Sequence, residues 1–122
     1  MQERDYTKKL DHFRQGVEQF NAEKFFDAHE SWEAIWLHAP EPDKSFLQGI
    51  TQVSAAFHHH SRGNRKGSES LLRRGLRKLE PFPGDYRGAK LDKLREELRK
   101  WLLIFSKKES GRNRARTKIE WI

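Results

Sequence analysis

Apolar residues recur in steps of three and four along five stretches of the chain, separated by polar and Gly- or Pro-containing segments. Such steps place side chains on one face of an α-helix. No stretch shows the strict alternation typical of a strand. The sequence therefore predicts an all-α fold, a five-helix bundle of antiparallel helical hairpins. The apolar stripes are Tyr6, Leu10, Phe13, Val17 and Phe20; Phe25, Trp32, Ile35 and Trp36; Phe46, Ile50, Val53 and Phe57; Leu71, Leu72, Leu76 and Leu79; and Leu91, Leu94, Leu98, Trp101, Leu102 and Phe105.

Residues that favour helix ends lie between these stripes. Asn21 is expected to cap the second helix, which runs to about His38, and Pro42 suits the first turn of the third. Gly63 can close the third helix and Asn64 can cap the fourth. The cluster PFPGDYRG, residues 81–88, predicts a turn before the fifth helix.

A weak internal repeat with a period of 40 residues supports the pairing of helices. Its spacing of small residues resembles the turn and second helix of a tetratricopeptide unit, where small side chains let paired helices approach closely. We expect one helical domain over residues 1–106, loosely tetratricopeptide-like. Residues 107–122 are expected to form an extended basic tail, from which Ile119, Trp121 and Ile122 can dock back. The repeated positions are Glu23, Ala28, Trp32 and Ile35, then Gly63, Ser68, Leu72 and Gly75.

Length and composition exclude several kinds of protein and of site. A chain of 122 residues fits one domain. The absence of Cys excludes disulfides, thiolate nucleophiles and Cys-based zinc sites. The first residues lack the apolar run of a signal peptide, and no stretch approaches the roughly 18 apolar residues of a membrane span. We expect a cytoplasmic protein without a membrane partner.

Positive charge is concentrated in two places. The formal net charge is +7, and the segment 106–122 carries six Lys or Arg against two Glu, a net charge of +4. A second basic block spans residues 62–78. These segments can be solvated surface, or they can attract nucleic acid or an acidic partner.

Two ionisable groups fall within the aromatic stripe of the second helix, in the segment FFDAHESWEAIW. At about 100° per residue, His29 lies about 40° and Glu33 about 80° from Phe25. Both are therefore predicted to be buried between aromatic side chains. An unpaired buried carboxylate is costly, so Glu33 needs a partner or a proton, and His29 stands one turn away.

The third helix offers partners for this pair. If it packs antiparallel to the second helix, its last turn lies near His29. One carboxylate with two or three imidazoles suits zinc, iron, nickel or manganese, so a divalent transition metal is a candidate cofactor. The candidate metal ligands are His29, Glu33, His59 and His60, and the candidate ligand-binding residues are Glu30, Trp36, Gln48 and Gln52.

Three interpretations of this cluster stay open. It can be a structural polar network in the core of a binding or scaffold module, or a metal or small-ligand site. It can also serve a metal-dependent hydrolase with Glu30 or Glu33 as general base. No nucleophile motif, phosphate loop or dinucleotide fingerprint supports catalysis, so no catalytic residue is assigned.

Two blocks of the sequence resemble a known family. FNAEKFFDAHESWEAIWLHAP, residues 20–40, and FLQGITQVSAAFHHHSRGN, residues 46–64, are similar to the DUF309 family, a domain of unknown function. The resemblance implies a small all-helical protein and no particular activity. Two positions depart from the family pattern: Glu23 replaces the usual turn glycine and Asp27 replaces Glu. Glu23 would strain its turn if that position requires a positive φ. The motif's polar positions fall on Asn21, His29, Glu30, Gln48, Gln52, His59, His60, Arg62 and Asn64, with Glu33 and Trp36 at an acidic and a Trp position.

Overall fold

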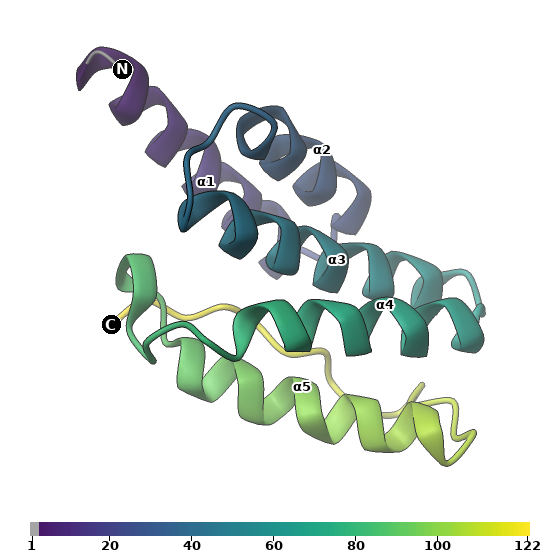
Figure 1. Cartoon of the computed structure of the whole chain (residues 1–122). Coiled ribbons are helices and arrows are strands. Elements are labelled where there is room, and N and C mark those ends of the chain that lie inside the picture. The colour runs from purple at the N-terminus through teal and green to yellow at the C-terminus, as the bar shows by residue number, and fades with distance from the viewer. Residues whose placement is uncertain (1–2) are drawn as a thin grey trace.

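The structure is a computed structural model that describes residues 3–122, with side chains described from residue 11 onward. Its described part contains five α-helices and one 3-10 turn, and the predicted all-α fold is confirmed (Figure 1). Extended pairing in this part is limited to an isolated bridge between Ala89 and Trp121. The elements are α1 (Glu3–Asn21), α2 (Phe25–Trp36), α3 (Asp43–Ser61), α4 (Arg65–Leu79), η1 (Tyr86–Gly88) and α5 (Leu91–Ser106).

Each helix packs against the next one along the chain, as expected for antiparallel hairpins (Figure 1). Close approach between neighbours depends on glycine. A Cβ at Gly16 in α1 would lie 2.1 Å from the Trp32 indole nitrogen, and one at Gly75 in α4 would lie 2.8 Å from Val53. The Trp32 indole N–H donates to the Phe13 carbonyl at 3.1 Å, which adds a polar tie between α1 and α2.

The apolar stripes form one continuous core. Phe13, Val17 and Phe20 of α1 are buried, whereas the side chains of the predicted stripe residues Tyr6 and Leu10 lie outside the described residues. The remaining predicted stripes are confirmed almost in full, because nearly all of their members lie in or against the core. Buried aromatic rings from α1, α2, α3 and α5 contact one another and supply much of the buried apolar area.

Of the two predicted helix N-caps, one is confirmed and the other is wrong. Asn64 does cap α4, since its side chain accepts a hydrogen bond from the Gly67 N–H at 3.0 Å. Asn21 does not cap α2, and this prediction is wrong. Asn21 is the last residue of α1, Lys24 precedes α2, and the turn between them contains Glu23 at φ 61°. The substitution of glycine by Glu23 therefore falls at a position of positive φ, where glycine is less strained.

The C-terminal residues return across the helices and pair with the turn before α5 (Figure 1). The Lys90 N–H donates to the Glu120 carbonyl at 2.8 Å, and the Ile122 N–H donates to the Gly88 carbonyl at 2.9 Å. The Asn21 carboxamide donates to the Ile119 carbonyl at 2.9 Å and accepts from the Ile119 N–H at 2.8 Å. Ile119 is only 1% exposed. The tail is therefore packed against the end of α1.

Candidate functional site

A pocket of about 310 Å³ opens between α2, α3 and α4. It contains five of the residues that the sequence nominated, together with Thr51 and Lys78. Helical spacing explains the grouping: the α2 residues follow one another by four and three positions, and on α3 Gln48 precedes Thr51 by three and Gln52 by four, so each set shares a face. The lining residues are His29, Glu33 and Trp36 from α2, Gln48, Thr51 and Gln52 from α3, and Lys78 from α4.

Two polar atoms in this pocket are buried without a hydrogen-bond partner among the described residues: the Trp36 indole nitrogen and Gln52 Oε1. A third buried atom, His29 Nδ1, makes no hydrogen bond but contacts Glu33 Oε2 at 3.4 Å. Nearly all buried polar groups in folded proteins are hydrogen-bonded, to protein atoms or to water. An unsatisfied buried group costs about 1–3 kcal/mol. Two such atoms around one cavity therefore indicate a place where polar atoms of a bound molecule can enter.

The His29–Glu33 pair lies at the edge of the core, and the prediction that both are buried among aromatic residues is wrong. Their side chains are 31% and 44% exposed, and His29 Nδ1 is 3.4 Å from Glu33 Oε2. The buried face of α2 instead consists of Phe25, Ala28, Trp32 and Ile35. Phe26, which would be buried if the stripe were centred on His29, is 54% exposed. The stripe is rotated because α2 is covered by α1 on one side and by α3 on the other.

Only part of the predicted metal-ligand set is brought together. The antiparallel packing of α2 and α3 holds, but His58 is the histidine on the side of α2: its ring centroid lies 5.7 Å from that of Phe26. The Asn64 side-chain amide donates a hydrogen bond to His59 Nδ1 at 3.0 Å, near the start of α4. Successive residues on a helix diverge by about 100°, which directs the three histidines to different neighbours.

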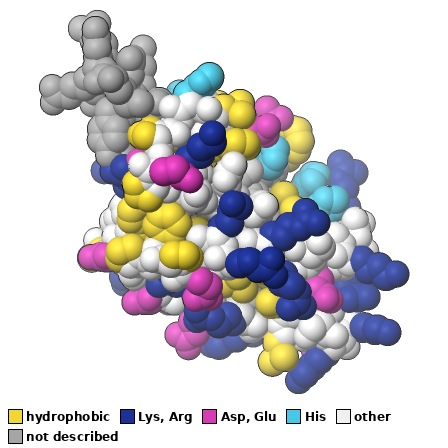
Figure 2. All heavy atoms as spheres, viewed as in Figure 1, with side chains coloured by type: hydrophobic (Ala, Val, Ile, Leu, Met, Phe, Trp, Pro, Cys, Tyr) yellow, Lys and Arg dark blue, Asp and Glu magenta, His cyan; other side chains and the backbone are white. Residues whose placement is uncertain are grey.

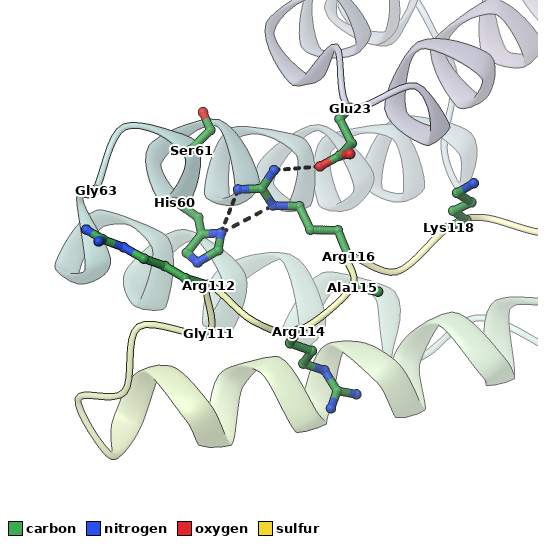
Figure 3. A pocket seen from close by; sticks show the side chains of 10 residues that line it. All are labelled: Glu23, His60, Ser61, Gly63, Gly111, Arg112, Arg114, Ala115, Arg116 and Lys118. Carbon is green, nitrogen blue, oxygen red and sulfur yellow. Dashed lines mark hydrogen bonds and ion pairs between the residues drawn. The ribbon is translucent and has the colours of Figure 1, made fainter.

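His60 faces the tail (Figure 3). Its Nδ1 lies 3.0 Å from an Arg116 guanidinium nitrogen, and its Nε2 lies 2.7 Å from the Ser110 carbonyl oxygen. Arg116 also pairs with Glu23 at 2.6 Å and lies over the Phe25 ring, 5.3 Å from its centroid. His60 therefore belongs to a tail-docking cluster and is remote from the pocket.

The described residues contain no group of three or more His, Cys, Asp or Glu side chains that could hold a metal ion. The pocket brings only His29 and Glu33 within reach of a common ion. Glu30 is exposed on α2 and does not line the pocket. None of the helices in the described part of the chain has the length and apolar character to span a bilayer.

Two lining residues were missed from the sequence. Thr51 directly precedes Gln52 and follows Gln48 by three residues, so the helical step could have suggested it. Its hydroxyl donates to the Leu47 carbonyl at 2.6 Å. Lys78 reaches the pocket from α4 because α3 and α4 pack closely, with Gly49 beside the Lys78 Cβ. No sequence pattern gives that contact.

Comparison with known proteins supports the resemblance noted in the sequence. The family described as "Domain of unknown function (DUF309)" matches residues 13–71. Just under half of this chain is therefore similar to the DUF309 family. Six of the seven pocket residues lie in the matched segment, and only Lys78 lies outside it.

A curated relative from Aquifex aeolicus (strain VF5), itself named an uncharacterized protein, is 27% identical over 93 residues. The alignment covers 75% of this chain but 27% of the relative, so this chain spans about a quarter of that protein's length. The tail-docking residues Ser110 and Arg116 lie beyond the DUF309 match. The pocket thus lies mostly in the matched segment, whereas the docked tail lies beyond it.

Proposed function

We propose that this protein is a binding module that holds a small polar molecule in the pocket between α2, α3 and α4. The observation that carries the proposal is the pair of buried polar atoms without a hydrogen-bond partner, Trp36 Nε1 and Gln52 Oε1, that lie around one cavity beside the His29–Glu33 pair. A purely structural polar network would be expected to satisfy its own members.

The lining defines the chemistry of the molecule. The Trp36 indole can only donate a hydrogen bond, and Gln52 Oε1 can only accept one. A ligand that offers both an acceptor and a donor, such as a primary amide, matches this pair. Glu33 and Lys78 supply one charge of each sign at the pocket. A small amide or an amino acid amide therefore fits better than a bare anion or cation.

The proposal that this pocket holds a metal ion has less support than the proposal of a small polar molecule. His29 and Glu33 would supply two ligands, and a structural zinc site needs about four. The bound molecule would have to provide the rest. Titration with zinc, nickel and manganese tests this version, since an unchanged melting temperature would argue against it.

The direct test follows the Trp36 indole N–H by NMR while a panel of primary amides and amino acid amides is added at millimolar concentration. Binding should move that resonance more than those of the other Trp indoles. Gln52→Leu should abolish the shift, whereas Glu30→Gln, an exposed change on α2 outside the pocket, should leave it unchanged.

The free energy of unfolding of Gln52→Leu distinguishes a ligand-binding role of Gln52 from a structural one. If the Gln52 carboxamide is retained for a ligand, replacing its unsatisfied oxygen by the apolar Leu side chain should leave the free energy of unfolding unchanged or raise it. If the cluster is structural, Gln52→Leu should lower stability by 1 kcal/mol or more, as expected for a lost buried hydrogen bond, about 1–3 kcal/mol. A clear loss of stability together with an unmoved Trp36 resonance would refute the proposal.

A further inference from the structure

We propose that a second, separate site binds the phosphate backbone of nucleic acid. It is a basic groove of about 580 Å³ between the exposed face of α4 and the C-terminal end of α5. Figure 2 shows Lys and Arg side chains gathered toward the end of the molecule where α4 begins and α5 ends. The groove is lined by Arg65, Lys66, Glu69, Ser70, Arg73, Arg74, Arg77, Ser106 and Lys108.

Most of the positive charge in this groove is available to a partner. Glu69 is the acidic lining residue, and it is shared between Arg65 at 3.4 Å and Arg73 at 3.5 Å. Among the described residues, no ion pair engages the other four lining cations, Lys66, Arg74, Arg77 and Lys108. A groove with several unneutralised cations concentrates anions by electrostatic attraction.

The cations are arranged in a line. Lys66, Ser70, Arg74 and Arg77 follow one another by four, four and three residues, so they lie along one face of α4. From residue 66 to residue 77 the helix rises by about 16 Å at 1.5 Å per residue. That length matches roughly five phosphates of one strand of a duplex, at 3.4 Å of helix axis each. A linear polyanion can therefore contact the whole row.

The end of α5 forms the second wall and is held in place. Arg65 donates to the Phe105 carbonyl at 2.9 Å, which ties the start of α4 to the last turn of α5. Lys108, at φ 61° just after that turn, contributes its side chain to the same groove. The groove is thus formed by two fixed helices, so a backbone would meet prearranged charges.

The lining favours nucleic acid over other polyanionic surfaces. Arg is a bidentate partner for phosphate, and four of the six lining cations are Arg. Among the described residues the groove has no aromatic or aliphatic lining residue, so it offers no aromatic platform for base stacking and no apolar side chain for insertion into a bilayer. Recognition should therefore depend on the backbone and be independent of base sequence.

The tail contributes less than its charge suggests. Arg114 pairs with Glu97 at 3.1 Å, and Arg116 pairs with Glu23 at 2.6 Å. These two cations are already neutralised within the molecule. Removal of residues 107–122 would also take away Lys108 and the Ile119 contacts, so truncation cannot separate binding from stability.

The test uses the full chain with labelled 12-nucleotide oligo(U), oligo(dT) and a 12-base-pair duplex. Arg74→Gln/Arg77→Gln removes two exposed cations of the groove. Lys24→Gln/Lys90→Gln makes the same change in net charge at exposed positions outside it. Circular dichroism checks that both variants keep the helical fold.

Four phosphate contacts predict a slope of log K against log salt of about −3 for single strands. The groove variant should reduce that slope by about 1.4 and weaken binding at 0.1 M salt roughly 25-fold. The control variant should change affinity less than twofold, and oligo(U) and oligo(dT) should bind similarly. Gln52→Leu in the separate pocket should leave oligonucleotide binding unchanged, so this proposal and the pocket proposal can fail independently.

Three results would overturn the inference. They are no binding of any oligonucleotide at 50 mM salt, equal weakening by the groove and control variants, and displacement of oligo(U) by poly-glutamate at a lower charge concentration than by unlabelled oligo(U). The last result would assign the groove to an acidic protein partner instead.

Discussion

The Asn21 carboxamide links the end of α1 to the tail through two hydrogen bonds, and its removal tests whether the tail is part of the folded domain. The side chain makes two hydrogen bonds to the Ile119 backbone, at 2.9 and 2.8 Å. Asn21→Ala removes both hydrogen bonds. The backbone N–H and C=O of Ile119, a residue that is 1% exposed, then lose these partners. Ala also has a higher helix propensity than Asn, so the change should not harm α1 itself.

The expected magnitude follows from these contacts. Each hydrogen bond contributes about 1 kcal/mol net, and an unsatisfied buried group adds to the loss. We expect Asn21→Ala to lower the free energy of unfolding by about 2–3 kcal/mol. For a chain of this size the melting temperature should fall by roughly 8–12 °C.

Urea unfolding monitored by circular dichroism measures this quantity in two backgrounds, the full chain and a chain shortened by residues 119–122. In the shortened chain Asn21 has lost its partner, so the same substitution should change stability by less than about 0.5 kcal/mol. The coupling free energy should therefore be about 2 kcal/mol. Equal losses in both backgrounds would refute the reasoning, since Asn21 would then act through α1 alone.

Three further outcomes are expected. Gly75→Ala would place a Cβ 2.8 Å from Val53 and should destabilise the chain by about 1–3 kcal/mol in urea unfolding, despite the gain in helix propensity. Glu23→Gly relieves a positive φ but loses an exposed ion pair, so it should raise the free energy of unfolding by up to about 1 kcal/mol; a loss above 1 kcal/mol would contradict this. Burial of the phenol is the larger cause and the hydrogen-bonded carboxylate of Asp43 the next, and they raise the pKa of Tyr86 from 10.0 to about 12. Because the raised pKa belongs to the folded state, the stabilisation by protonated Tyr86 is complete below pH 10 and is lost as the pH rises toward 12. Tyr86→Phe should remove this pH dependence of the free energy of unfolding.

The hydrophobic pattern determined most of the fold by itself. Steps of three and four residues located all five helices, and the Asn64 cap and the turn before α5 were also readable. These features are local, because a helix face and a cap depend on residues a few positions apart. The motif blocks likewise identified the family segment and five pocket residues from sequence alone.

Features that depend on contacts between distant segments required the tertiary structure. The orientation of α2 is an example: a helical wheel gives relative angles, but the packing of α1 and α3 decides which angle is buried. This rotation moved His29 and Glu33 to the edge of the core. The contacts of α3 with α4 and with the tail decided where His59 and His60 lie.

The tail and the two proposed sites illustrate the same limit. Asn21 resembles a cap in the sequence, yet its partner, Ile119, is 98 positions away. Lys78 enters the pocket and Lys108 enters the basic groove only because neighbouring helices bring them there. The sequence by itself determined the helices and the residues available on each face. The tertiary structure decided which faces meet, because that choice depends on the combined burial of side chains from the whole chain.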